Sequence, residues 1–140
     1  MIEKVRAYIA TCPYLEEFTA VNVNYLVDKV KAYSVNEGVG YNPVLKKDII
    51  GNEECQFQFI FDAKLYWNEE IANNIDNSVF FEKYSNWLRE NNKNKIFPQI
   101  EDENIQIQSI GATTNGYIFA TNADEAIYRI SCIMKYRRKR

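Results

Sequence analysis

A long alternating stretch near the C-terminus, from Ala126 to Arg137, restricts this chain to folds that contain an extended sheet. Apolar and polar residues alternate along it with the period of two that a half-buried β-strand requires. A strand of about twelve residues spans roughly 40 Å, which is about twice the usual length. It therefore either crosses a curved sheet or extends beyond its own domain. The residues predicted to share its buried face are Ala126, Tyr128, Ile130, Cys132, Met134 and Tyr136.

A second alternating stretch, from Cys55 to Phe61, places phenylalanines and a cysteine on one face and glutamines on the other. Burying one aromatic side chain contributes about 2–3 kcal/mol, so this phenylalanine row is expected to face the core. The dipeptide Gly51–Asn52 is typical of a hairpin turn and predicts that an earlier strand, Val44 to Ile50, precedes it. The stretch from Gly38 to Pro43 is the most loop-like part of the chain.

The C-terminal third contains a further hairpin signal, Asn115–Gly116, between the predicted strands Ile105–Ile110 and Tyr117–Thr121. A change of parity inside the first of these strands predicts a β-bulge. A strand is predicted earlier in the chain at Ala20–Leu26, where apolar residues and asparagines alternate, and a weaker strand is predicted at Tyr33–Asn36.

Two helices are predicted from apolar residues that recur with helical spacing. The first begins near Ile2 and must end before Pro13, because the residue before a proline leaves the helical region. The second follows a cap at Asn68 and carries a wide apolar stripe as far as Leu88. The polar triplet Asp76–Ser78 could divide it into two helices, because all three residues favour caps.

The predicted fold class is α+β. We expect a single domain in which a mainly antiparallel sheet of four to six strands packs on one long and one short helix. The domain is expected to span residues 1–137, and residues 138–140 are expected to form a basic C-terminal tail.

The chain contains no histidine, which excludes Ser-His-Asp triads, Cys-His pairs, HExxH zinc sites and His-ligated haem. The cysteines Cys12, Cys55 and Cys132 are far apart and lack CxxC spacing, so buried thiols in a reducing compartment are expected. The segment Gly38–Gly40 lacks the further residues of a dinucleotide fingerprint or a P-loop. No apolar run is long enough to cross a membrane.

Acidic residues often stand next to each other in the sequence. The side chains of adjacent residues point in different directions on a strand or helix, so two such carboxylates cannot easily share a metal ion. Glu101 and Glu103 have the one spacing that could converge on a hard cation, and solvated loop charge is the preferred interpretation. We therefore predict no catalytic residue, no cofactor and no metal site. The protein is predicted not to be an enzyme.

Several tyrosines have no obvious core partner, and tyrosine is enriched at protein interfaces. The last residues of the chain are basic, although the chain as a whole has a formal net charge of −2. They form either a solvated tail or a contact with DNA or a neighbouring acidic subunit. The predicted interface residues are Tyr33, Tyr41, Tyr117, Arg129, Lys135, Arg137, Arg138 and Arg140.

Four stretches, taken in their order and spacing, resemble the small tail-terminator family of phages and prophages of Gram-positive bacteria, whose members are also named tail-completion or minor capsid proteins. The likeness lies in the succession of the stretches and covers most of the chain. They are Cys12 to Phe18 running into Val21 to Leu26, Gln56 to Phe61, Phe80 to Leu88, and Ile105 to Tyr136 with its Thr114-Asn115-Gly116-Tyr117 turn.

The resemblance implies a structural virion protein that forms a ring of six copies, caps the tail tube, ends tube growth and joins the tail to the head–neck connector. Its partners would be further copies of itself, the major tail tube protein, the connector or stopper protein, and the sheath if the tail contracts. DNA would only pass through the lumen, and no membrane would be involved. The protein would be assembled in the cytoplasm of the bacterial host and reside in the tail or neck of the virion.

Two other classes stay open at this point: another ring of the same neck, such as a head–tail adaptor or stopper, and a small non-viral ligand-binding domain. For ring formation, each subunit needs two different complementary patches. We expect the Ala126–Arg137 strand and the Val35–Pro43 loop to supply them, because an exposed strand edge can pair with a neighbouring chain.

Overall fold

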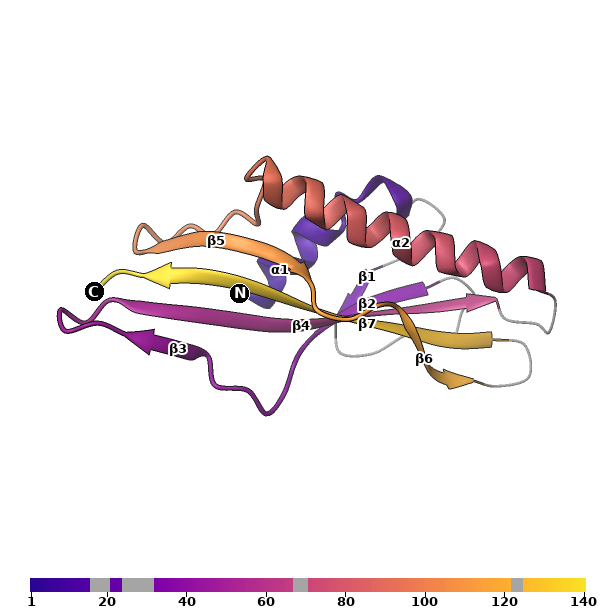
Figure 1. Ribbon diagram of the computed structural model, residues 1–140, viewed down its shortest axis with the longest axis horizontal. Helices are drawn as coiled ribbons and strands as arrows, with labels where there is room; N and C mark the ends of the chain where they lie inside the picture. The colour runs from indigo at the N-terminus through magenta and orange to yellow at the C-terminus, as the bar shows by residue number, and fades with distance from the viewer. Residues whose placement is uncertain (16–20, 24–31, 67–70, 122–124) are drawn as a thin grey trace.

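The computed structural model describes residues 1–15, 21–23, 32–66, 71–121 and 125–140 of the chain. The described strands form one elongated sheet, and both helices lie along the same side of it (Figure 1). In chain order the elements are α1 (Ile2–Ile9), the 3₁₀ turn η1 (Pro13–Leu15), β1 (Val21–Val23), β2 (Ala32–Glu37), β3 (Val44–Lys47), β4 (Glu53–Tyr66), α2 (Ile71–Lys93), β5 (Ile105–Ala112), β6 (Tyr117–Thr121) and β7 (Glu125–Arg138).

The centre of the sheet is a long antiparallel ribbon made of β4 and β7, each of 14 residues. Its register pairs Glu53 with Arg138 at one end and Tyr66 with Glu125 at the other. A ribbon of this length spans roughly 45 Å. The long C-terminal strand predicted from the sequence therefore lies along its own sheet rather than beyond it.

The strand β7 is an internal strand of the sheet. β4 occupies one of its edges, and β5 and β6 occupy successive parts of the other edge. The expectation that Ala126–Arg137 offers a long free edge to a neighbouring subunit is therefore wrong. The reason is that β5 and β6 follow each other in the same direction along this edge, so the backbone groups of β7 are paired within the subunit. The hairpin predicted at Asn115–Gly116 is wrong for the same reason, because β5 and β6 both pair with β7 and not with each other.

The predicted α+β class is confirmed. Six strands, β2 to β7, are joined by antiparallel pairings and pack on one long and one short helix. The three-residue β1 adds a parallel pairing with β2, so the described sheet has seven strands. The remainder of the predicted strand Ala20–Leu26 lies outside the described residues.

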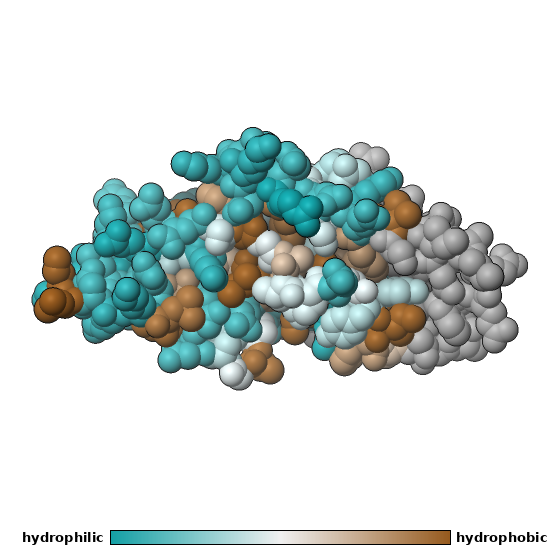
Figure 2. Space-filling model, in the orientation of Figure 1, coloured by the Kyte–Doolittle hydropathy of each residue, from teal (hydrophilic) through white to brown (hydrophobic). Residues whose placement is uncertain are grey.

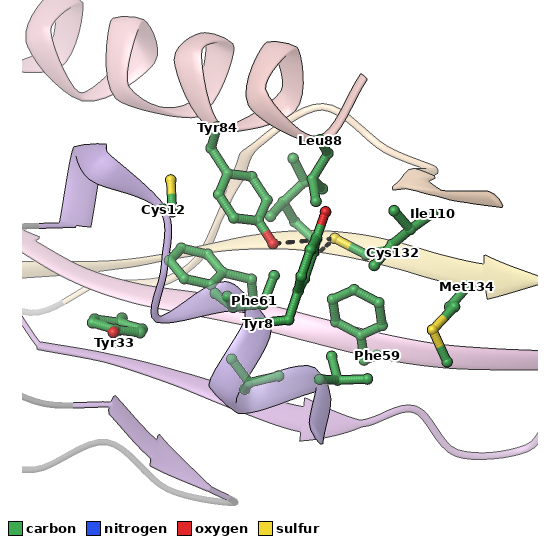
Figure 3. Packing of buried hydrophobic residues seen from close by; sticks show 14 of the residues in the cluster. Tyr8, Cys12, Tyr33, Phe59, Phe61, Tyr84, Leu88, Ile110, Cys132 and Met134 are labelled. Carbon is green, nitrogen blue, oxygen red and sulfur yellow. Dashed lines mark hydrogen bonds between the residues drawn. The ribbon is translucent and has the colours of Figure 1, made fainter. Parts of the chain in front are cut away.

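The core lies between the helices and the face of the sheet that carries the phenylalanine row. Phe57, Phe59 and Phe61 are buried there, as the alternation of β4 predicts. The buried face of β7 is confirmed from Tyr128 to Tyr136, while the side chain of Ala126 lies outside the described set. Figure 3 shows Tyr84 and Leu88 of α2 directed at this layer, and the Tyr84 hydroxyl lies 3.7 Å from the Cys132 sulfur.

The long helix α2 is continuous over its 23 residues, so its division at Asp76–Ser78 is not observed. Cap preferences amount to about 1 kcal/mol per residue. They are outweighed here by the packing of one uninterrupted helix, whose Phe81, Tyr84 and Leu88 are buried against the sheet. The predicted cap at Asn68 lies outside the described residues. The predicted bulge is confirmed by a register shift between Ile107 and Ser109 of β5.

The C-terminal end of α2 is closed by two backbone hydrogen bonds of the Schellman type. The Ile96 N–H donates to the Asn91 carbonyl (2.8 Å), and the Lys95 N–H donates to the Asn92 carbonyl (3.3 Å). This geometry needs a left-handed residue, and Lys95 adopts a φ of 58°. Most such positions hold glycine, because a Cβ makes this conformation less favourable.

Replacing Lys95 with glycine is expected to stabilise the protein by about 0.5–1 kcal/mol, because the left-handed conformation then carries no Cβ strain. The gain is read from urea unfolding followed by far-UV circular dichroism. The control is Glu82→Gly, an exposed position inside the helix, which is expected to destabilise by about 1 kcal/mol. Equal losses for both variants would contradict this account of the helix end.

Candidate assembly surfaces

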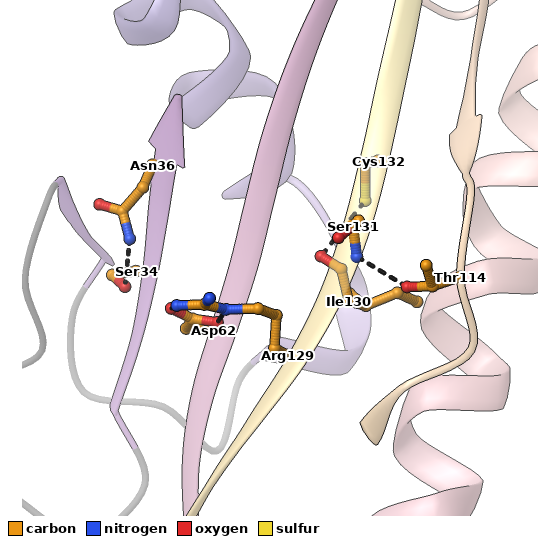
Figure 4. Close-up of polar contacts among 8 residues, drawn as sticks. All are labelled: Ser34, Asn36, Asp62, Thr114, Arg129, Ile130, Ser131 and Cys132. Atoms are coloured by element: carbon orange, nitrogen blue, oxygen red, sulfur yellow. Dashed lines mark hydrogen bonds and ion pairs between the residues drawn. The ribbon is translucent and has the colours of Figure 1, made fainter. Parts of the chain in front are cut away.

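The face of the sheet opposite the helices carries an ion pair between its two central strands. Asp62 of β4 and Arg129 of β7 are register partners, and Arg129 donates from Nε to Oδ1 (2.8 Å) and from Nη2 to Oδ2 (3.0 Å) (Figure 4). The side chains are 7% and 22% exposed, respectively. The hydrogen bonds to Asp62 raise the pKa of the Arg129 guanidinium, although partial burial acts in the opposite direction. Arg129 is predicted from the sequence to contact a neighbouring subunit, but its guanidinium is bound to a carboxylate of its own subunit.

The same arginine attaches the outer strand β6 to the sheet. Its guanidinium carbon lies 3.5 Å from the centroid of the Phe119 ring, which is close enough for a cation–π contact. On the other side of the ribbon, the Asn36 amide donates to the Ser34 hydroxyl at 3.4 Å. Among the described residues the Asn36 Oδ1 atom has no hydrogen-bond partner. Ser34 is the register partner of Asp62, so these polar groups form one row across the three strands.

The described residues contain no cluster of three or more cysteine and carboxylate side chains that could hold a metal ion. None of the described helices combines the length and the apolar character needed to cross a membrane. Glu101 meets Lys4 in an exposed ion pair at 3.5 Å, and Asp102 accepts the Asn104 N–H within its own loop.

The three cysteines are free and buried, as predicted. Burial raises the pKa of Cys132 to about 12 and that of Cys12 to about 11. Because the thiolate is the reactive form, these thiols are held in their unreactive state at neutral pH.

We expect the native protein to react with a thiol reagent such as Ellman's reagent at pH 8 roughly a hundredfold more slowly than the protein in urea. In urea all three thiols are expected to titrate. The measurement is the absorbance time course with and without denaturant. Rapid reaction of even one thiol in the native state would show that a cysteine is more accessible than its burial indicates.

The outer strand β6 exposes apolar side chains on both of its faces, and we name these residues, Tyr117, Ile118 and Phe119, the β6 surface. Their exposed fractions are 44%, 47% and 53%, respectively. The turn before the strand is fixed, because Gly116 lies against the Phe81 ring and a Cβ there would approach it to 2.6 Å. The β6 surface is therefore held in place although its side chains face solvent.

A second exposed apolar area is the turn between β3 and β4, which we name the hairpin tip and define as residues 48–52. The Asp48 carboxylate accepts the backbone N–H groups of Ile50, Gly51 and Asn52 at 2.9–3.0 Å. The turn consequently starts at Asp48, and the predicted strand Val44–Ile50 ends at Lys47 instead. Ile49 is fully exposed and Ile50 largely so, and Figure 2 shows hydrophobic atoms at this extremity of the molecule.

The basic end of the chain is attached to the hairpin tip. The Arg140 N–H donates to the Asn52 side chain (3.0 Å), and the Arg140 guanidinium donates to the Ile50 carbonyl (3.1 Å). Arg138 belongs to β7 and lies 3.9 Å from Glu53, and Arg137 lies 4.0 Å from Asp48. The residues predicted to form a tail thus continue and brace the end of the sheet.

The remaining predicted interface residues have different positions. Tyr33 is a core residue, 4% exposed and stacked on Phe61, so the prediction that it lies at a surface is wrong. The cause is the pairing of β2 with β4, which turns Tyr33 toward the helices. Tyr41 is partly exposed and donates to the Glu37 carboxylate (3.2 Å), and Lys135 is exposed on β7. In the predicted Val35–Pro43 contact loop, Val35 is fully buried in β2, which leaves residues 38–43 as loop.

Sequence reasoning missed Ile118, Phe119 and the two isoleucines of the hairpin tip. The signals were present, because Tyr117–Phe119 is an apolar run without alternation, and Ile49–Ile50 directly precedes a Gly–Asn turn. Apolar residues in such places are not needed for the core, and this is a mark of an interaction surface.

Comparison with known proteins finds no protein-family model that matches this chain and no curated protein that is significantly similar to it.

Proposed function

We propose that this protein is a structural subunit that assembles with further copies of itself into a closed ring. The observation that carries the proposal is the presence of two different exposed apolar areas, the β6 surface and the hairpin tip, near opposite ends of one sheet (Figure 1). Ile118 is in register with Tyr128, which pairs with Ala63, about ten residues along β4 from Glu53. That separation is roughly 33 Å.

Two unlike patches on one rigid body favour head-to-tail association, because each copy can offer one patch to each neighbour. Such contacts close into a ring when the rotation between copies allows it. Exposed apolar side chains on rigid elements would otherwise be a liability for a protein that acts alone. The Asp62–Arg129 pair supports the proposal, because the contact of Arg129 with Phe119 attaches β6, and with it the first patch, to the sheet.

The resemblance to tail-terminator proteins suggests the larger assembly to which this ring would belong. In this proposal six copies sit on the last ring of tail tube protein, stop its growth and present a surface to the head–tail connector or stopper. The sheath is an additional partner if the tail contracts, and the protein resides in the virion tail or neck.

The test combines assembly with location. Purified protein is examined by light scattering and native mass spectrometry, then added to the cognate tail tube protein while tube length is followed by electron microscopy. We expect rings of one size and tubes that stop growing once capped. If the protein is found instead inside the neck of particles, away from the tube end, it is an adaptor or stopper. A protein that stays monomeric at all concentrations and leaves tube length unchanged would contradict the proposal.

A further inference from the structure

Three described strands have a side that no described strand pairs with, because β1 pairs with β2 alone, β3 with β4 alone and β6 with β7 alone. The outer edge of β5 is different, because α2 lies beside it and the Asn92 side chain accepts the Ile110 N–H at 3.0 Å. The edge of β1 is only three residues long, and the chain before and after it lies outside the described residues, which leaves β3 and β6 as the two free edges.

Both free edges carry exposed apolar side chains. On β3, Leu45 is half exposed, and all residues after Val44 face solvent. On β6, the exposed residues are those of the β6 surface. Unpaired edges with exposed apolar side chains readily accept a strand from another chain, because the new ladder satisfies their N–H and C=O groups.

The directions of the two strands fit each other. β3 is antiparallel to β4, β4 is antiparallel to β7, and β7 is antiparallel to β6. It follows that β3 and β6 run in opposite directions within one copy. If a second copy is placed beside the first in a similar orientation, its β3 therefore lies antiparallel to β6 of the first. Antiparallel pairing is the slightly more stable arrangement per residue.

The charges on β3 disfavour pairing of this strand with a second β3. Lys46 and Lys47 are exposed on β3, and in such a pair lysines would face lysines. β6 carries no charged residue, so it places no like charge opposite these lysines.

From these observations we propose that β3 of one copy pairs with β6 of the next copy, so that the sheet continues from subunit to subunit around the ring. The proposal rests on the ring-forming function above and specifies its subunit contact. A second copy of this chain thus occupies each free edge. Each copy pairs through its β3 with one neighbour and through its β6 with the other. The contact is heterologous, which distinguishes it from a two-fold dimer.

Variants with one added, exposed cysteine test the contact directly, because the three native thiols are buried. One preparation carries Leu45→Cys and another carries Ile118→Cys, and a short bismaleimide is applied to each alone and to an equimolar mixture. A bismaleimide tolerates small differences in register that a disulfide would not. We expect covalent dimers in the mixture at about tenfold or more the level in either preparation alone, since only unlike positions meet in a heterologous contact.

The control is Ile96→Cys, an exposed position of similar accessibility after α2, mixed with Ile118→Cys. It is expected to give only background dimer. A second arm replaces Ile118 with lysine, which places a charge on the β6 edge; ring formation is expected to fall about tenfold or more. Ile96→Lys is the matched variant for this arm and is expected to leave assembly unchanged.

The outcomes separate this contact from the proposed function. Rings that form normally but show no cross-link between positions 45 and 118 overturn the strand pairing and leave the ring proposal standing. Strong cross-linking of Leu45→Cys with itself would show a two-fold contact and also overturn it. A protein that is monomeric throughout overturns both. Cross-links in the mixture, together with loss of rings in Ile118→Lys alone, support both.

Discussion

Replacing Phe61 with alanine is expected to lower the free energy of unfolding by about 3–5 kcal/mol. The side chain has 0% exposure and lies between three other aromatic rings. Its centroid is 4.6 Å from that of Tyr84, 5.5 Å from that of Tyr33 and 6.2 Å from that of Phe80. Alanine would remove these contacts and leave a cavity between the sheet and α2. Domains of this size are stable by only about 5–15 kcal/mol, so the loss is a large fraction of the total.

The measurement is equilibrium unfolding in urea, followed by tryptophan fluorescence. Ile49→Ala is the control, because it removes an apolar side chain of similar character from a fully exposed site. Its effect on stability is expected to stay within about 0.5 kcal/mol. A loss below about 1 kcal/mol for Phe61→Ala would mean that the aromatic layer is not the centre of the core.

Removing either member of the Asp62–Arg129 pair is expected to cost about 3 kcal/mol or more. Each single variant, Asp62→Ala or Arg129→Ala, leaves the other charge in a largely buried place without its bidentate partner. The Arg129 variant also removes the cation that lies over Phe119, so β6 should loosen as well. Replacement of both residues removes the unpaired charge and is therefore expected to cost less than the sum of the single effects.

A double-mutant cycle in urea measures this coupling. Lys135→Ala is the matched control, because Lys135 is a cation on the same strand that is exposed to solvent. Its effect is expected to be below about 0.5 kcal/mol. Strict additivity of Asp62→Ala and Arg129→Ala would refute the claim that the pair acts as a unit. Hydrogen exchange of the β6 amides in Arg129→Ala reports separately on the attachment of that strand.

The two charged residues show why part of the assembly surface could not be predicted from the sequence. Asp62 and Arg129 are 67 positions apart, and only the register of β4 with β7 places them opposite each other. Without that register, Arg129 is one of many charges on the polar side of an alternating strand. Tyr33 is a similar case, since its burial depends on which strand lies beside β2.

Most local patterns, in contrast, gave correct predictions, although the hairpin predicted at Asn115–Gly116 is wrong because β5 and β6 both pair with β7. The alternation from Cys55 to Phe61 determined which side of β4 is buried, because the side-chain period of a strand is fixed by the backbone. The same reason gave the buried face of β7, and the change of parity in β5 gave its bulge. The turn at Gly51 was also visible, although the Asp48 carboxylate moved its start two residues before the predicted end of the strand.

The sequence by itself therefore determined the α+β class, the faces of the two long strands and the absence of imidazole chemistry, because these depend on residue type and on short spacings. The tertiary structure decided that β7 is internal, that Arg129 is engaged within its own subunit, and that β3 and β6 present the free edges. Strand order and register are set by contacts between residues far apart in the chain. No local period encodes those contacts, and they alone determine which edges are left for a second copy.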